Sequence, residues 1–297
     1  MKKFIFAKIG SGNSLAGRYL SGNSEVNFPA VPIYFDCNYD NEEQFLKDGG
    51  AKGQGELFFE CGRHPDEKYI VVIHEGNVHI LRPSGSVQFK KSSVLEDKDG
   101  YVKLLPVEIL KKMPISEVPV ILASIGANRY YSSGTFREIS DVGNIRAIQM
   151  VLGLNIAVPD SPTIIHAIEC ISSIEFETLV AKIFEEAGFF VPAYRGGTMP
   201  GADLFVYNKL TAPISIGGLS VAPGARKSIQ VKLRVHATLP PQGIDYLVAC
   251  NVPESSSVFG AEWLAIALAK SPRTKEWLKT SLEWLPPYFI KETCGAL

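Results

Sequence analysis

Three polar residues in the second half of the chain, Asp203, Gln230 and Lys232, are of types that can bind a cation and act on a bound ligand. Asp203 follows a Pro-Gly-Ala turn and precedes an apolar run, while Gln230 and Lys232 lie two positions apart in a later apolar run. Because the side chains of a strand alternate between its two faces, Gln230 and Lys232 are predicted to share one face. Polar groups on an otherwise buried strand cost free energy unless they find partners. A metal site with an acidic residue supplies such partners.

These residue types predict a site that holds a divalent cation and activates water. Asp203 offers a hard oxygen ligand, and the side-chain oxygen of Gln230 can add another. A bound metal lowers the pKa of a water ligand and neutralises charge on a phosphorane-like transition state. Lys232 can orient that water or stabilise the same charge. Glu177, on a preceding helical segment, can reach the metal directly or through water. The predicted catalytic set is Glu177, Asp203, Gln230 and Lys232, with Mg²⁺ or Mn²⁺ held by Glu177, Asp203 and Gln230.

The elements expected around this set form an α/β unit. The helical spacing of apolar residues predicts an amphipathic helix over 173–188, with Ser173 as its N-cap and Gly188 as its stop. Strands are predicted at 189–191, 202–207, 228–234 and 245–250, and helices at 262–269 and 274–284. Asp203 and Gln230 lie 27 positions apart, so residues 208–227 are expected to form an inserted loop or hairpin. This order of elements predicts a mixed sheet flanked by helices.

The first part of the chain is expected to form a separate β-rich domain. Residues 68–74 and 78–81, on either side of a Glu-Gly-Asn turn, predict a hairpin. A glycine-rich loop is expected at 49–55, and a short helix at 106–113. The segment 158–162 has the composition of a linker, so the predicted domains are 1–158 and 159–297.

The composition excludes several classes of protein. The chain has 297 residues, of which 46% are hydrophobic and 21% charged, and its net charge is −1. These values fit a globular protein of about two domains and exclude a disordered, collagen-like or strongly basic chain. The five cysteines form no CxxC pair, which argues against a disulfide framework or a structural zinc site. No apolar run approaches the roughly 18–20 residues of a membrane span, and we expect a cytoplasmic protein without a membrane partner.

The order of these motifs resembles that of the Mrr-like restriction endonuclease domain, a branch of the PD-(D/E)xK nuclease superfamily. The resemblance covers roughly residues 165–252 and rests on Glu175-Phe-Glu177, Gly201-Ala-Asp203 and Gln230-Val-Lys232. It implies a restriction-endonuclease-like sheet in which Asp203 binds metal, Gln230 and Lys232 form the QxK pair, and Glu177 is the helix glutamate. It further implies a Mg²⁺-dependent, type II or type IV-like deoxyribonuclease that restricts foreign DNA. Because one such site cuts one strand, double-strand cleavage implies a homodimer.

Basic and aromatic residues outside this set are candidates for DNA contacts. Those near the motifs can contact phosphates, and those in the segment 128–137 can combine base stacking with phosphate contact. The predicted DNA-binding residues are Arg195, Lys227, Arg234, Arg129, Tyr130 and Arg137. The order of strands and turns in the first domain, with Gly76 in a hairpin and Asn128 after an apolar stretch, is similar to that of EVE and other PUA-like β-barrels. This similarity implies recognition of a modified base in an aromatic pocket.

Two other functions fit the same residues. In the first, the nuclease fold has lost catalysis and serves as a DNA-binding or sensing module, in which Lys232 is simply paired with Asp203. In the second, the chain is a repair-type nuclease that acts on structured or single-stranded nucleic acid. A requirement for metal distinguishes a restriction enzyme from the first of these functions. Cleavage of a panel of substrates distinguishes a restriction enzyme from the second.

Overall fold

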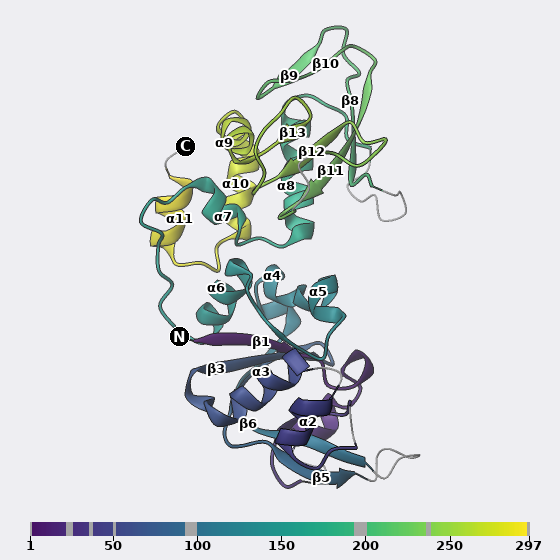
Figure 1. Ribbon diagram of the computed structural model, residues 1–297. Helices are drawn as coiled ribbons and strands as arrows, with labels where there is room; N and C mark the ends of the chain where they lie inside the picture. The colour runs from purple at the N-terminus through teal and green to yellow at the C-terminus, as the bar shows by residue number, and fades with distance from the viewer. Residues whose placement is uncertain are drawn as a thin grey trace. The chain divides into compact units, whose positions relative to one another are not determined.

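The computed structural model describes residues 2–21, 26–35, 38–49, 52–92, 100–192, 201–235 and 239–295 (Figure 1). The chain divides into two compact units, Met1–Leu154 and Asn155–Leu297. The boundary expected after residue 158 lies in the segment 155–163, which is described without helix or strand. Both units combine helices with strands, so the predicted α/β class is confirmed. Of the helices described, none is long and apolar enough to cross a bilayer.

Unit 1 is organised by a seven-stranded mixed sheet in the order β2-β6-β4-β3-β1-β7, with β5 also paired to β6. Its strands are β1 (Lys3–Ala7), β2 (Ala30–Ile33), β3 (Lys68–His74), β4 (Asn77–Pro83), β5 (Gln88–Ser92), β6 (Gly100–Pro114) and β7 (Phe136–Glu138). β1 and β3 run parallel, whereas β3 and β4 form the predicted antiparallel hairpin. Glu75 and Gly76 both have positive φ in its turn, as a two-residue turn of this kind requires.

Helices of unit 1 surround this sheet. They are α1 (Ala16–Leu20), α2 (Glu42–Asp48), α3 (Lys52–Arg63), α4 (Val120–Ala123), α5 (Arg129–Ser132) and α6 (Val142–Val151), and short 3₁₀ turns lie at Ser11–Asn13, Pro65–Glu67, Ile115–Glu117 and Ile125–Ala127. Asp141 caps α6, because its side chain accepts the backbone N–H of Asn144.

Two predictions for unit 1 are wrong. The glycine-rich segment expected as a loop partly belongs to α3, whose Phe58 and Cys61 enter the core. Gly55 lets α3 approach α2 closely, since a Cβ there would collide with the ring of Phe45. The helix expected at 106–113 is instead the second half of β6, which pairs with β4 from Val107↔Pro83 to Pro114↔Asn77. The free edge of β4 has backbone groups without hydrogen-bond partners in the hairpin. Pairing with β4 therefore stabilises residues 107–114 as a strand more than their local pattern stabilises a helix.

Unit 2 contains a four-stranded mixed sheet in the order β13-β12-β11-β8. Its strands are β8 (Leu204–Tyr207), β11 (Arg226–Lys232), β12 (Tyr246–Ala249) and β13 (Val258–Phe259). β11 pairs antiparallel with β8 and parallel with β12. The predicted mixed sheet flanked by helices is therefore confirmed (Figure 1). The strand expected at 189–191 is reduced to an isolated bridge between Phe190 and Tyr207.

The interval between β8 and β11 contains the predicted inserted hairpin, formed by β9 (Ile214–Ile216) and β10 (Leu219–Val221). Gly217 and Gly218 turn the chain with positive φ, and a Cβ on Gly217 would collide with the ring of Trp263. The fully buried Asn208 closes the base of the insertion, because its amide nitrogen donates to the carbonyl oxygens of Ala212 and Val221. The insertion therefore leaves the pairing of β8 with β11 intact.

The helices of unit 2 are α7 (Ile164–Ile168), α8 (Ser173–Glu186), α9 (Ala261–Ala269), α10 (Pro272–Ser281) and α11 (Pro287–Cys294). A capping box starts α8: Ser172 Oγ accepts the N–H of Glu175, and the Glu175 carboxylate accepts the N–H of Ser172. The N-cap is thus Ser172 rather than the predicted Ser173.

At β8 and β11, the core of unit 2 lies on one face of the sheet. α8 contributes a buried apolar stripe of Phe176, Leu179, Val180, Ile183 and Phe184. The same cluster contains the alternate sheet residues Leu204, Val206, Ile229 and Val231. Because strand side chains alternate, the intervening residues of β8 and β11 lie on the opposite face.

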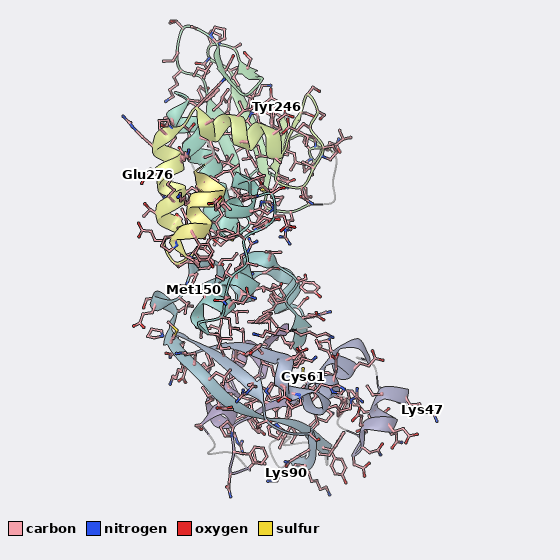
Figure 2. The ribbon with its side chains drawn as sticks, turned by 90° about the vertical axis from the view of Figure 1, so that its left-hand side faces the viewer. Lys47, Cys61, Lys90, Met150, Tyr246 and Glu276 are labelled. Atoms are coloured by element: carbon pink, nitrogen blue, oxygen red, sulfur yellow. The ribbon has the colours of Figure 1, made fainter. Side chains whose placement is uncertain are left out.

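The four cysteines within the described ranges are all free and buried: Cys61, Cys170, Cys250 and Cys294. Burial raises the pKa of Cys61 and of Cys250 to about 12, so both are protonated and unreactive at neutral pH. Figure 2 labels Cys61 among the side chains of unit 1. Cys37 lies outside the described residues.

Candidate functional site

The structure joins Asp203 to Lys232, as the alternation of β11 predicts. The Nζ atom of Lys232 lies 2.9 Å from Asp203 Oδ2, and the same oxygen accepts the backbone N–H of Val231 at 2.8 Å. Asp203 directly precedes β8, and its own N–H donates to the carbonyl oxygen of Ile229 at 2.9 Å. The carboxylate therefore continues the hydrogen-bond ladder of β11 beyond the end of β8. The side chains of Asp203 and Lys232 are 19% and 39% exposed, so solvent and ligands reach both.

Asp245, on the other side of β11, makes different hydrogen bonds from Asp203. Asp245 directly precedes β12; its Oδ1 accepts Lys227 Nζ, and its Oδ2 accepts both the N–H and the Oγ–H of Ser228, all at 2.8 Å. Both of its oxygens are thus occupied by β11. Within the part of the chain that the structure describes, the hydrogen bonds of Asp203 run to Oδ2. Its Oδ1 is therefore the oxygen that can bind a ligand.

Gln230 lies beside this carboxylate on β11. Ile229 and Val231 enter the core, so Gln230 and Lys232 share the opposite face, where Gln230 is half-buried. The oxygens of Asp203 and Gln230 are hard donors, and Mg²⁺ usually keeps several waters and takes only one or two carboxylates. This donor set fits Mg²⁺ or Mn²⁺ with water completing the coordination. Within the described ranges, no group of three or more His, Cys, Asp and Glu side chains could hold a metal.

Glu177 lies in a different layer from these three residues. It is half-buried on α8, one position after the core residue Phe176. α8 packs on the face of β11 that carries Ile229 and Val231, opposite to Lys232. The structure therefore brings Asp203, Gln230 and Lys232 together, and it places Glu177 on the helix that packs against the opposite face of β11.

Two of the predicted DNA-binding residues in unit 2 already have carboxylate partners. Lys227 pairs with Asp245, and Arg234 Nη2 lies 3.3 Å from Glu169 Oε1. The hydrogen bond to Asp245 raises the pKa of Lys227. Burial pushes the pKa of Asp245 upward, but the hydrogen bonds from Lys227 and Ser228 outweigh it and hold that pKa below its ordinary value. A phosphate would have to displace a carboxylate at either cation. Arg195 lies outside the described residues.

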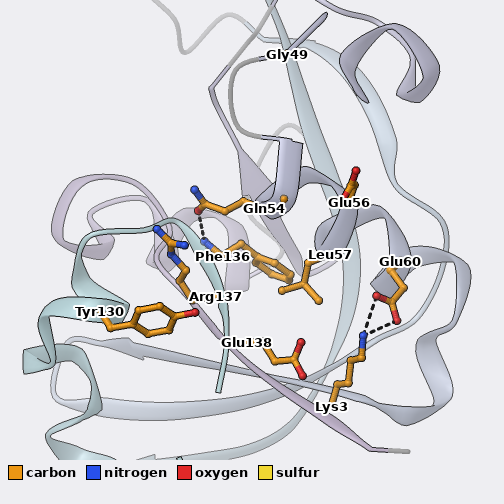
Figure 3. Close-up of a pocket in the computed structure, with 11 residues that line it drawn as sticks. Lys3, Gly49, Gln54, Glu56, Leu57, Glu60, Tyr130, Phe136, Arg137 and Glu138 are labelled. Carbon is orange, nitrogen blue, oxygen red and sulfur yellow. Dashed lines mark hydrogen bonds and ion pairs between the residues drawn. The ribbon is translucent and has the colours of Figure 1, made fainter. Parts of the chain in front are cut away.

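Tyr130 and Arg137 of unit 1 line a cavity of about 740 Å³ (Figure 3). The guanidinium carbon of Arg137 lies 5.3 Å from the centre of the Tyr130 ring, and the Nε atom of Arg137 is buried without a hydrogen-bond partner among the described residues. Gln54 Oε1 accepts the N–H groups of Thr135 and Phe136 at 2.8 and 3.0 Å, which fixes β7 against α3. The side chain of Arg129 lies outside the described part.

The opposite wall of this cavity is charged. Lys3 Nζ lies 3.0 Å from both carboxylate oxygens of Glu60, and Figure 3 shows Glu138 pointing into the same space. Gln54, Lys3 and Glu138 were not among the predicted residues, because they come from three segments far apart in the chain. Asp245 was also missed, although it carries the same signal as Asp203, an aspartate directly before a buried strand.

No family model, no curated protein and no solved structure matches the chain.

Proposed function

We propose that the chain is a metal-dependent endonuclease that hydrolyses phosphodiester bonds of DNA at Asp203, Gln230 and Lys232. The observation that carries this proposal is the position of the Asp203 carboxylate. Oδ2 is held by the Val231 N–H and by Lys232, while Oδ1 is left for a ligand at the meeting point of β8 and β11. A fixed carboxylate oxygen can hold a metal ion, and a bound metal ion can activate water for hydrolysis.

The roles follow from these positions. When bound, Mg²⁺ or Mn²⁺ supplies Lewis acidity and lowers the pKa of a coordinated water. Asp203 and Gln230 would hold the cation through their side-chain oxygens, and Glu177 remains a predicted ligand. Lys232 lies one hydrogen bond from Asp203, so its ammonium group can stabilise charge that develops on the scissile phosphate.

We infer that unit 1 recognises the DNA, including a modified base, and that the protein restricts foreign DNA as a homodimer. The support is the cavity of unit 1, where an aromatic ring and a cation lie together at Tyr130 and Arg137. A ring can stack on a base, and a guanidinium can bind a base edge or a phosphate. A PUA-like barrel for unit 1 and a restriction-endonuclease-like fold for unit 2 are part of this proposal.

One observation favours a second function, a DNA-binding module without catalysis. Lys232 and Asp203 neutralise each other, and such a pair can serve structure alone. In that case, neither a divalent cation nor Lys232 matters for DNA binding.

The experiment is cleavage of supercoiled plasmid, unmodified or carrying modified cytosine, with Mg²⁺, Mn²⁺ or EDTA. We expect the wild type to cut in either metal and not in EDTA, and to prefer the modified plasmid. Lys232→Ala should bind DNA as the wild type does and cut at least about 100-fold more slowly, the loss found when one charge-stabilising donor is removed. Metal-independent binding without cutting of either plasmid would overturn the nuclease and support the binding module.

A further inference from the structure

Phe190 places an exposed ring at the β8 edge of the sheet of unit 2, on the face that carries Gln230 and Lys232. Its neighbours Phe189 and Val191 both enter the core, so the Phe190 side chain lies on the other side of the chain. Phe190 bridges Tyr207 through backbone hydrogen bonds of 3.0 and 2.9 Å, and directly opposed residues share a face. Phe190 is 47% exposed, so a ligand on this face can contact its ring.

The adjoining strands add rings and cations to this face. Leu204 and Val206 enter the core, which leaves Phe205 and Tyr207 on the same side as Phe190. The guanidinium carbon of Arg226 lies 3.8 Å from the centre of the Phe205 ring. Lys209 Nζ lies 3.6 Å from the centre of the Phe190 ring. We call Phe190, Phe205, Tyr207, Lys209 and Arg226 the ring–cation face.

The cations of this face differ from Lys227 and Arg234, the basic residues of unit 2 that were predicted to bind DNA and are described by the structure. Lys227 and Arg234 pair with carboxylates, whereas the described ion pairs include neither Lys209 nor Arg226. Both side chains are exposed and rest on aromatic rings. A cation over a ring keeps its charge available to an anion on its outer side.

The ring–cation face leads directly to the candidate catalytic residues. Tyr207 and Asp203 are four positions apart at the two ends of β8, which is about 13 Å at the rise of an extended strand. Arg226 and Lys232 mark the two ends of β11, and Gln230 and Lys232 share the face of Arg226. A nucleic-acid strand that lies along β8 would thus meet rings and cations first and Asp203 next.

We propose that the ring–cation face binds one unpaired strand of DNA and presents it to Asp203. The proposal rests on the proposed function, since it assigns the substrate of that same site. Rings can stack only on bases whose faces are free, which excludes the paired bases of an intact duplex. Lys209 and Arg226 supply the positive charge that the phosphates require, although the chain as a whole has a net charge of −1.

The test measures binding separately from cleavage, by fluorescence anisotropy in EDTA. The probes are a short labelled single-stranded DNA, the same sequence as a duplex, and the corresponding single-stranded RNA. The variants are Phe190→Ala and Arg226→Ala. Their matched controls are Ile266→Ala, which removes another exposed apolar side chain of unit 2, and Lys270→Ala, which removes another exposed cation.

We expect the wild type to bind the single-stranded DNA more tightly than the duplex. Phe190→Ala should weaken single-strand binding roughly tenfold, the effect of losing one stacked base. Arg226→Ala should weaken it and reduce the dependence of log K on log salt concentration by about 0.7. Both controls should bind as the wild type does, and thermal melting should show all four variants folded.

Several results would overturn the proposal. These are a preference for the duplex, tighter binding of RNA than of DNA, equal losses in the controls, or dissociation of a dimer on Phe190→Ala, which would make the face a contact between two copies. Single-strand binding that the variants lose, in a protein that never cuts, would keep the ring–cation face and reject the nuclease. Metal-dependent cutting without single-strand binding would support the nuclease and reject the ring–cation face as a DNA-binding surface.

Discussion

At the scale of single residues, the two aspartates that flank β11 make different hydrogen bonds to that strand. Asp245 uses both oxygens to hold Lys227 and Ser228, and Asp203 uses Oδ2 to hold Val231 and Lys232. The first arrangement satisfies a carboxylate completely, whereas the second leaves an oxygen for a cation. This difference is the reason why we predict a stabilising role for Asp245 and propose a catalytic role for Asp203.

The pairing of Asp245 predicts how stability depends on pH. Its pKa is lower in the folded chain than the ordinary value of 3.8, so the unfolded chain binds more protons as the pH falls. The stabilisation is therefore complete above the unfolded pKa and is lost as the pH falls through the folded one. Asp245→Asn should be less stable than the wild type at neutral pH and lose less stability on acidification. Urea unfolding from about pH 7 to about pH 3 measures this.

The control for that experiment is Asp160→Asn, since Asp160 is exposed in the segment 155–163 at the start of unit 2. It should follow the wild-type profile. If the free energy of unfolding of Asp245→Asn depended on pH as that of the wild type does over the whole pH range, the Lys227 pair would contribute nothing to stability.

At the scale of elements, the inserted hairpin explains how residues far apart in sequence come together. The residues between β8 and β11 fold into the β9–β10 hairpin, and hydrogen bonds of Asn208 close this insertion at its base. Trp263 Nε1 donates to the carbonyl oxygen of Ile216 and anchors the far side of the hairpin to α9. The register of β8 on β11, and with it the Asp203–Lys232 contact, depends on this closure.

Asn208→Ala should therefore destabilise the protein. Its side chain makes two hydrogen bonds through Nδ2 and accepts the N–H of Leu210 through Oδ1, and its loss leaves buried backbone groups unpaired. We expect a loss of about 1–3 kcal/mol in the free energy of unfolding, measured by urea denaturation. Asn251→Ala is the matched control, because Asn251 makes similar hydrogen bonds to Val235 at an exposed position. Equal losses in the two variants would contradict this account of the insertion.

The sequence predicts those elements that local periodicity determines. The stripe of α8, the β3–β4 hairpin and the alternation of Gln230 and Lys232 are of this kind. α3 and the second half of β6 were missed because their stability comes from distant partners, Phe45 for Gly55 and β4 for β6. The position of Glu177 relative to the sheet could not be predicted either, because helical spacing does not show which face of a sheet a helix covers.

At the scale of the whole molecule, the two units have separate cores, and unit 2 begins with the segment 155–163. Within this segment, residues 157–163 are partly or fully exposed and lack helix and strand. Limited digestion with subtilisin should therefore cut at 157–163 and yield fragments that contain one unit each, identified by mass spectrometry. Survival of the intact segment while β6 or α8 is degraded would contradict the division into two units.

The measurement that tests the central claim most directly compares two isosteric variants, Asp203→Asn and Asp245→Asn, in Mg²⁺-dependent cleavage of plasmid. Both remove one carboxylate that pairs with a lysine of β11, and both keep an amide oxygen for the backbone N–H of that strand. We predict that Asp203→Asn lowers the cleavage rate at least about 100-fold at unchanged folding, because it removes the charged metal ligand, while Asp245→Asn cuts within a few-fold of the wild type. Equal rates for the two variants, or wild-type cleavage by Asp203→Asn, would contradict the assignment of Asp203 as the catalytic carboxylate.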